Sequence, residues 1–316
     1  MSVAGLERAL LNIVKIHVAR SFCGICCLPF LAAQSAPETP PQPDEIVVTG
    51  TRESDDERRR KADAHVRALG VANGQRSVAR WIDPVCPRVI GLSQEHARIV
   101  ELQMRATADS LKIETAKSPC QSNIIVSFVS GGAAVARLVA ERGHRQLGEV
   151  PLPKRDSLLN SKAPIRWWHL TELRSKDGDR PVSFTPPSVQ IEGGGSLPSG
   201  SDTTVLSHYN SSIISTMTVR AIRSAVVIVD VDHAKGTALK SVTDYATLVS
   251  LAEIEFDGEA PPQSILALFN KNERAGQLTD WDRSFLTELY RLPLDRLAKQ
   301  QRQRLVGALT RQDSKP

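Results

Sequence analysis

The chain has 316 residues, of which 41% are hydrophobic, so it is long enough for one large domain or two small ones with a buried core. Its net charge is +5, with acidic and basic residues interspersed. Aromatic residues make up only 4%, and no basic run alternates with stacking side chains, which argues against a nucleic-acid partner.

Residues 1–35 follow the pattern of a secretory signal peptide. Arg8, Lys15 and Arg20 precede an apolar run over residues 22–33, and small residues suited to a signal peptidase follow. We expect cleavage on export, which places the mature chain in the periplasm or cell envelope of a bacterium. An uncleaved membrane anchor is the alternative, but basic residues interrupt any apolar stretch of the roughly 20 residues that a span needs. The mature chain is therefore expected to have no transmembrane span.

Residues 36–77 are interpreted as an extended linker followed by a charged helix. Proline and acidic residues are frequent at 37–44, and the charge run DDERRRK at 55–61 is typical of a solvated helix face. Between them, the segment DEIVVTGTR at 44–52 resembles the start of the plug domain of TonB-dependent outer-membrane receptors. A receptor also needs many amphipathic strands to close a barrel, and the remaining chain does not supply them. The resemblance therefore implies a short strand and not a receptor.

A single α/β domain is expected over residues 78–316, with α+β as the alternative class. A strand at 85–90, a helix at 94–111 capped by Ser93 and a strand at 123–129 follow one another in this order. A helical crossover joins parallel strands, so this unit predicts a parallel βαβ arrangement within a mixed sheet that has flanking helices.

Cysteine usage agrees with export. Three of the five cysteines lie within residues 1–35, which leaves Cys86 and Cys120 in the mature chain. Cys86 begins the first predicted strand and Cys120 precedes the second, and the starts of adjacent parallel strands lie side by side. A disulfide between Cys86 and Cys120 is therefore predicted, with two buried free thiols as the alternative.

A strand over residues 164–174 carries the candidate ligand groove. Odd-numbered side chains from Ile165 to Leu173 share one face of this strand, and both faces mix apolar and polar residues. Trp167, Trp168 and His169 are candidates to line a groove, and a half-buried sheet edge is the alternative explanation. Glycine and proline after residue 176 predict a flexible loop to about residue 211.

The strongest core pattern lies between residues 212 and 291. An apolar strand over 216–231 is expected to be covered on both faces. An apolar helix over 242–254 follows, and then a helix over 279–291 that begins with a capping pattern of Thr279 and Asp282. A preceding turn at Gly131 and Gly132 lacks the residues of a nucleotide-binding loop, so an ordinary strand-to-helix turn is expected there.

Patterns for catalysis are scarce. No two of the seven histidines stand three or four residues apart, and no nucleophile elbow is present. His208, Asp232 and His233 are the candidate zinc ligands, because Asp and His near a strand end are suitable donors. Scattered surface histidines are the alternative.

A wider resemblance rests on the order of short motifs, which are Arg80-Trp81, NIIVSFV at 123–129, the strand at 225–231 and LTDWD at 278–282. This order resembles a family of exported bacterial proteins of unknown function with a zincin-like, metallopeptidase-like layout. Members carry a polar helix with glutamates, whereas the helix here reads DYATLVSLA at 244–252, without His or Glu. The resemblance implies a degenerate zincin-like layout and a non-catalytic envelope protein that binds an unknown protein or envelope component, or has a structural role, without a cofactor. A metal-dependent, peptidase-like hydrolase that uses zinc through non-standard ligands is the alternative.

Overall fold

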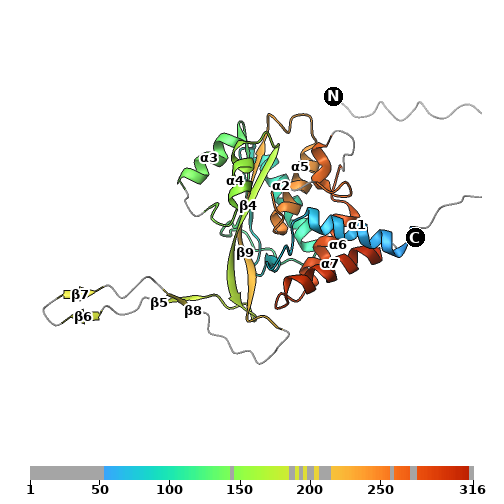
Figure 1. The fold of residues 1–316 in the computed structure, drawn as a ribbon. Coiled ribbons are helices and arrows are strands. Elements are labelled where there is room, and N and C mark those ends of the chain that lie inside the picture. Colours follow the sequence, from blue (N-terminus) through green and yellow to red (C-terminus); the bar gives the residue numbers. More distant parts are fainter. Residues whose placement is uncertain are drawn as a thin grey trace, which may run out of the picture. The chain divides into compact units, whose positions relative to one another are not determined.

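The computed structural model describes residues 53–142, 146–184, 189–191, 195–197, 203–205, 215–256, 260–270 and 276–312. The predicted signal peptide, the proline-rich linker and the receptor-like segment at 44–52 lie outside these ranges. The described residues belong to one compact unit, which starts at Arg52. Its centre is a mixed sheet between helices, so the chain has the predicted α/β class (Figure 1).

Strand β9 (Thr218–Asp230) organises the five-stranded sheet. Along one edge it pairs with antiparallel β4 (Ile165–Ser175). Along the other edge it pairs in parallel with β1 (Ala79–Trp81) and, further along, with β3 (Ile124–Val129). Strand β2 (Pro87–Ile90) is parallel to β3. The apolar run that predicted a strand covered on both faces is therefore the central strand of the sheet.

The predicted βαβ unit is confirmed as β2, α2 (Gln94–Ser110) and the parallel strand β3. The hydroxyl of Ser93 caps α2 by accepting a hydrogen bond from the His96 N–H at 3.3 Å. The remaining helices of the sheet layers are α3 (Gly132–Arg142), α4 (Leu152–Asn160) and α5 (Leu239–Leu251). A 3-10 turn, η1 (Ile265–Phe269), precedes α6 (Asp280–Arg291), whose capping box of Thr279 and Asp282 is present as predicted.

Alternate side chains of β4 show which helices cover which face of the sheet. His169 reaches the carbonyl of Val249 in α5, whereas Arg166 donates to the carbonyl of Leu158 in α4. Successive strand residues point to opposite faces, so α5 and α4 lie on opposite sides of the sheet. Contacts of α3 with β4 and β9, and the bond from the Gly132 N–H to Asp230, place α3 with α4.

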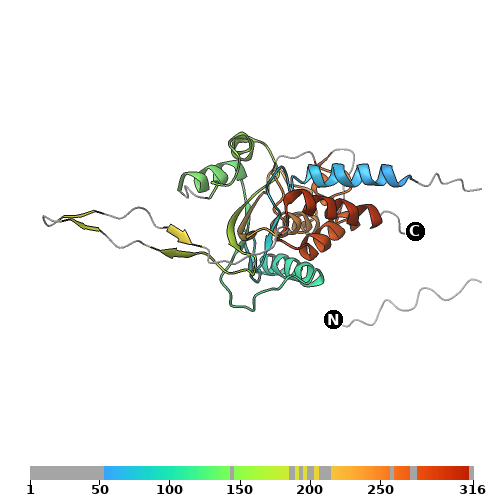
Figure 2. The ribbon, with the colours of Figure 1, turned by 60° about the horizontal axis from the view of Figure 1, so that its bottom comes forward.

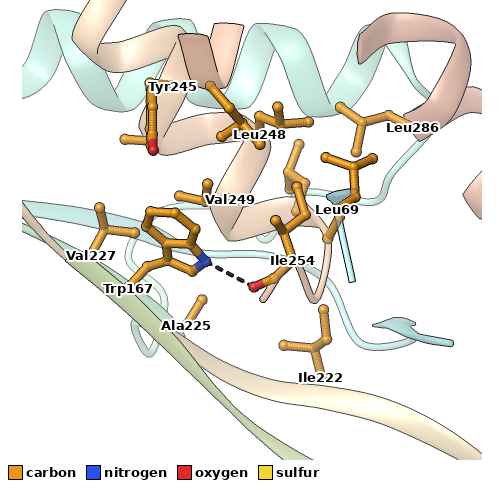
Figure 3. Close-up of a cluster of buried hydrophobic side chains, with 14 of the residues drawn as sticks. Leu69, Trp167, Ile222, Ala225, Val227, Tyr245, Leu248, Val249, Ile254 and Leu286 are labelled. Atoms are coloured by element: carbon orange, nitrogen blue, oxygen red, sulfur yellow. Dashed lines mark hydrogen bonds between the residues drawn. The ribbon is translucent and has the colours of Figure 1, made fainter. Parts of the chain in front are cut away.

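The core on the α5 face is apolar and closely packed. Figure 3 shows Trp167, Ala225 and Val227 of the sheet facing Leu248 and Val249 of α5. Every residue of α5 from Ser241 to Leu251 is buried, because the sheet lies on one side and α6 on another. The helix therefore provides packing surface, as its apolar sequence predicts.

Helix α1 (Asp55–Ala68) differs from its prediction as a solvated helix before the domain. Its charged residues face solvent, but Ala62 and Val66 are completely buried, and α1 packs against α7 (Ala298–Gln312) (Figure 2). The four-residue spacing of 62 and 66 puts both on one helix face. The compact unit therefore includes residues 53–77, ahead of the expected start at residue 78.

The segment predicted as a loop over 176–211 contains short paired strands in its described parts. β5 (Val182–Phe184) pairs with β8 (Thr203–Val205), and β6 (Val189–Ile191) pairs with β7 (Gly195–Leu197), both antiparallel. Along the chain, β6 and β7 lie between β5 and β8, and these four strands lie between β4 and β9. The three antiparallel pairs are therefore nested in sequence. Across the described ranges, no helix has both the length and the apolar character needed to cross a membrane.

Candidate functional site

A small pocket lies beside β4, where five segments of the chain converge. Its walls come from residues 70–77 after α1, residues 149–154 at the start of α4, residues 167–169 of β4, Arg220 of β9 and residues 253–256 after α5. Its volume is about 60 Å³. Pockets for drug-sized ligands measure roughly 300–1,000 Å³, so only a small group or the end of a larger molecule fits here.

The three residues of the predicted groove all line this pocket. Trp167 donates from Nε1 to the Ile254 carbonyl at 2.9 Å (Figure 3), and His169 Nε2 lies 2.7 Å from the Val249 carbonyl oxygen. Burial lowers the pKa of His169, although the negative charge of Glu253 and the bond to Val249 oppose this. The imidazole is therefore neutral at pH 7, and its Nε2–H donates to Val249.

Trp168 differs from its two neighbours because its polar atom has no partner. It is 2% exposed, and its Nε1–H makes no hydrogen bond within the part of the chain that the structure describes. An unpaired buried donor costs about 1–3 kcal/mol. By alternation along β4, the Trp168 side chain shares the face of Arg166, opposite Trp167 and His169, so this unpaired N–H is not a contact that the pocket offers to a ligand.

A β-bulge in β9 places Arg220 at the pocket. Leu170 pairs with Ser224, but the next β4 residue, Thr171, pairs with Ile222, so Arg223 is an extra residue in β9. Strict alternation from Ala225 would put Arg223 on the face of His169. The extra residue instead puts Ile222 and Arg220 on that face, while Arg223 is exposed.

Arg220 and Glu253 form the inner ion pair of the pocket. Nη1 and Nη2 of Arg220 lie 2.6 and 2.7 Å from the two carboxylate oxygens of Glu253. The side chains are only 12% and 15% exposed. This bidentate geometry is the strongest form of ion pair, and it holds both side chains in fixed positions at the bottom of the pocket. Arg220 also donates to the Thr171 hydroxyl at 3.0 Å.

Arg76 and Glu149 form a second ion pair, which is more exposed than the pair of Arg220 and Glu253. Arg76 donates to Glu253 at 2.6 Å and, with a longer distance of 3.3 Å, to Glu149. Glu149 accepts 2.5 Å hydrogen bonds from both the N–H and the hydroxyl of Thr171. Arg76 and Glu149 are 39% and 30% exposed, so both can exchange a protein partner for a ligand. Lys154 and Glu255 form a further ion pair at the rim.

This arrangement is suited to binding a small polar group. Three cations, Arg76, Lys154 and Arg220, are matched by three carboxylates, so the pocket has no net charge to favour a simple anion or cation. Its described walls contain no Cys and no Ser placed beside a base, which are the usual requirements for a nucleophile. Complementary charges beside an aromatic wall instead favour a molecule that carries both signs of charge.

Sequence reasoning found the β4 residues of this pocket but not its ion pairs. Glu253 and Glu255 match no binding motif in the sequence. The signal for their role is the alternation of LAEIEF at 251–256, which puts both acids on the side opposite Ile254 and Phe256. Arg76 and Glu149 carry no local pattern, because they reach the pocket from loops far apart in the chain.

The predicted metal ligands are only partly described. Asp232 accepts a hydrogen bond from the Ser130 hydroxyl, and His233 Nδ1 lies 3.2 Å from Asp230. His208 lies outside the described residues. Among the residues that are described, no group of three or more His, Cys, Asp or Glu side chains could hold a metal ion.

In the glycine turn before α3, a carboxylate of the protein itself binds the backbone. The Gly132 N–H donates to the Asp230 carboxylate at 2.7 Å. Burial raises the pKa of Asp230, but the bonds from Gly132, His233 and Asp232 outweigh it and lower the pKa. The carboxylate therefore stays ionised at the position where a phosphate would bind a helix N-terminus. A Cβ at Gly132 would lie 3.0 Å from the Asp230 Cβ, which explains the glycine.

The predicted pairing of Cys86 with Cys120 is present. Cys86 and Cys120 are joined at disulfide distance, with Cα atoms 6.2 Å apart, at the starts of β2 and β3. The bond therefore joins the starts of the two parallel strands of the βαβ unit, and β2 is the edge strand of the sheet.

Comparisons with known proteins do not assign the chain to a family. No protein-family model, no curated protein and no solved structure matches the chain. The zincin-like layout and the receptor-like segment are thus expectations from short motifs, and the pocket beside β4 is the feature from which a function can be argued.

Proposed function

We propose that this chain is an exported bacterial envelope protein with a non-catalytic binding role, and that its ligand occupies the pocket beside β4. The observation that carries the proposal is the convergence of two arginines and two glutamates, from four separate segments, on a pocket lined by Trp167 and Trp168. Export itself rests on the pattern of residues 1–35.

The ligand group that fits best carries an amine and a carboxylate close together, as an amino acid or the end of a peptide does. Glu149 makes the longest ion-pair contacts of the pocket, at 3.3 Å to Arg76 and 3.7 Å to Arg220. A ligand carboxylate can replace Glu149 on Arg76, and its amine can bind the released Glu149. The bidentate ion pair of Arg220 and Glu253 is not broken by this exchange, and it maintains the geometry of the pocket.

Calorimetric titration of the protein with glycine and glycylglycine tests this function, with acetate and methylammonium as probes that carry one charge. We expect the dipolar probes to bind and the single-charge probes not to. Arg76→Gln and Glu149→Gln should each weaken binding at least tenfold, because a hydrogen bond to a charged group contributes about 1.5–3 kcal/mol. Arg98→Gln, an exposed change on α2, is the matched control.

Two results count against the proposal. If no dipolar probe binds, or if the Arg76→Gln and Glu149→Gln proteins bind as tightly as the unchanged protein, the pocket is not a site of this kind. The alternative, a zinc-dependent hydrolase, is separated by metal analysis of the purified protein. Stoichiometric zinc that is lost on His233→Ala would support the hydrolase.

A further inference from the structure

The Cys86–Cys120 disulfide has a cation beside it. Arg105 of α2 places Nη2 at 3.3 Å from Cys120 Sγ and 4.0 Å from Cys86 Sγ. Nη1 of the same guanidinium donates to the Ala116 carbonyl at 2.6 Å, which anchors the group. Arg105 is in no ion pair with the residues that the structure describes, so no carboxylate there neutralises its charge.

A positive charge at this distance matters more for the reduced than for the oxidised form. A disulfide carries no charge, whereas a cysteine thiolate is stabilised by a neighbouring arginine, which lowers the thiol pKa. Arg105 therefore favours the products of reduction over the disulfide. It also favours the departure of a sulfur as a thiolate during exchange.

The two sulfurs differ in access. Cys86 is 3% exposed, at the start of β2, whereas Cys120 is half-buried in the loop before β3. An attacking thiolate must approach one sulfur along the S–S axis, and Cys120 is the more exposed of the two residues, so the geometry favours attack at Cys120. Cys86 Sγ, 4.0 Å from Arg105, is then the leaving group.

We propose that the Cys86–Cys120 disulfide is a thiol–disulfide exchange site, attacked at Cys120 by a small thiol of the glutathione type and assisted by Arg105. The first thiolate forms a mixed disulfide with Cys120 and releases Cys86 as a thiolate. A second thiolate attacks the sulfur of the bound thiol and releases Cys120. Two electrons pass from two thiols, which become one disulfide, to the protein disulfide, which becomes two thiols.

The fold around the two cysteines does not depend on the covalent bond alone. The Asn123 side chain accepts from the Cys86 N–H at 2.7 Å and donates to the Pro84 carbonyl at 3.0 Å. Strands β2 and β3 also pair over four residues, from Pro87 with Ile124 onward. Both thiols therefore stay beside Arg105 after reduction, and the bond can form again.

Equilibration of the full chain with reduced and oxidised glutathione tests the site, with alkylation and peptide mass spectrometry to follow Cys86 and Cys120 separately. We expect a mixed disulfide with Cys120. Arg105→Gln should make the disulfide about tenfold harder to reduce, which is about 30 mV for a two-electron couple. Arg105→Lys should stay near the unchanged protein, and Arg98→Gln, an exposed change on the same helix, is the control.

The outcomes divide clearly. A mixed disulfide found on Cys86 overturns the assignment of the attacked sulfur. Equal reduction equilibria for the unchanged protein and Arg105→Gln overturn the role of the cation. If the charge acts only on the thiolates, Arg105→Gln leaves the urea midpoint of the oxidised protein unchanged. A lower midpoint together with an unchanged reduction equilibrium would show that Arg105 has only a structural role.

Discussion

Within the part of the chain that the structure describes, His65 is a buried side chain whose polar atoms lack hydrogen-bond partners. It lies in α1, is 2% exposed, and its ring is 5.1 Å from the ring of Trp281. Neither ring nitrogen has a hydrogen-bond partner in the described part of the chain. Burial lowers the pKa of His65 from 6.5 to about 4. The folded protein therefore holds this imidazole neutral, whereas the unfolded chain protonates it below pH 6.5.

This difference predicts a loss of stability in acid. Because the folded pKa is lowered, the stability is complete above pH 6.5 and falls as the pH drops toward 4, by about 2–3 kcal/mol at pH 4.5. His65→Phe removes the titrating group, so its free energy of unfolding in urea should fall less between pH 7 and pH 4.5. The exposed change His96→Phe should keep the original dependence, and parallel pH curves for His65→Phe and the unchanged protein would contradict the prediction.

At the scale of one element, the bulge in β9 decides which arginine belongs to the pocket. Alternation alone assigns Arg223, whereas the register with β4 assigns Arg220. The two residues are three positions apart and chemically identical, which makes them a matched pair for mutation.

Arg220→Gln should destabilise the protein by about 3 kcal/mol, because it leaves the nearly buried Glu253 without its two-pronged partner. Arg223→Gln should change the free energy of unfolding by less than about 0.5 kcal/mol, since Arg223 is exposed. Urea denaturation of both variants gives the comparison. If the two variants lose the same stability, the register described for β9 is wrong.

The sequence was informative wherever a local signal sufficed. Ser93 marked the start of α2, Thr279 with Asp282 marked that of α6, and the apolar run marked the central strand β9. It was not sufficient for the bulge, because nothing in the residues around Arg223 distinguishes a regular strand from one with an extra residue. Helix α7 was not anticipated, since its apolar positions are spaced between many Gln and Arg residues.

At the scale of the whole molecule, α1 is part of the folded unit and not a separate solvated helix before it. Val66 and Leu69 are 0% and 1% exposed, and they cover apolar residues that would otherwise face water. Burying a Val and a Leu side chain contributes about 1.5–3 kcal/mol each, a large share of the 5–15 kcal/mol that stabilises a typical domain.

A chain that begins at Val78 should therefore lose cooperative unfolding, whereas a chain that begins at Glu53 should keep it. The expected loss is about 5 kcal/mol. Urea titration followed by circular dichroism in the near and far ultraviolet distinguishes a lost tertiary structure from a smaller stable domain. An unchanged midpoint for the shorter chain would show that residues 78–316 suffice.

The position of β9 late in the chain has a consequence for the order in which the sheet can assemble. Apart from β2 with β3, every pair in the five-stranded sheet includes β9. The β4–β9 hairpin closes a loop of about 40 residues and the β1–β9 pair one of about 140, which costs about 1 kcal/mol more in chain entropy. Most long-range pairing in the five-stranded sheet therefore waits for one strand. Of that sheet, a nascent chain that has not yet reached Thr218 can pair only the disulfide-linked strands β2 and β3.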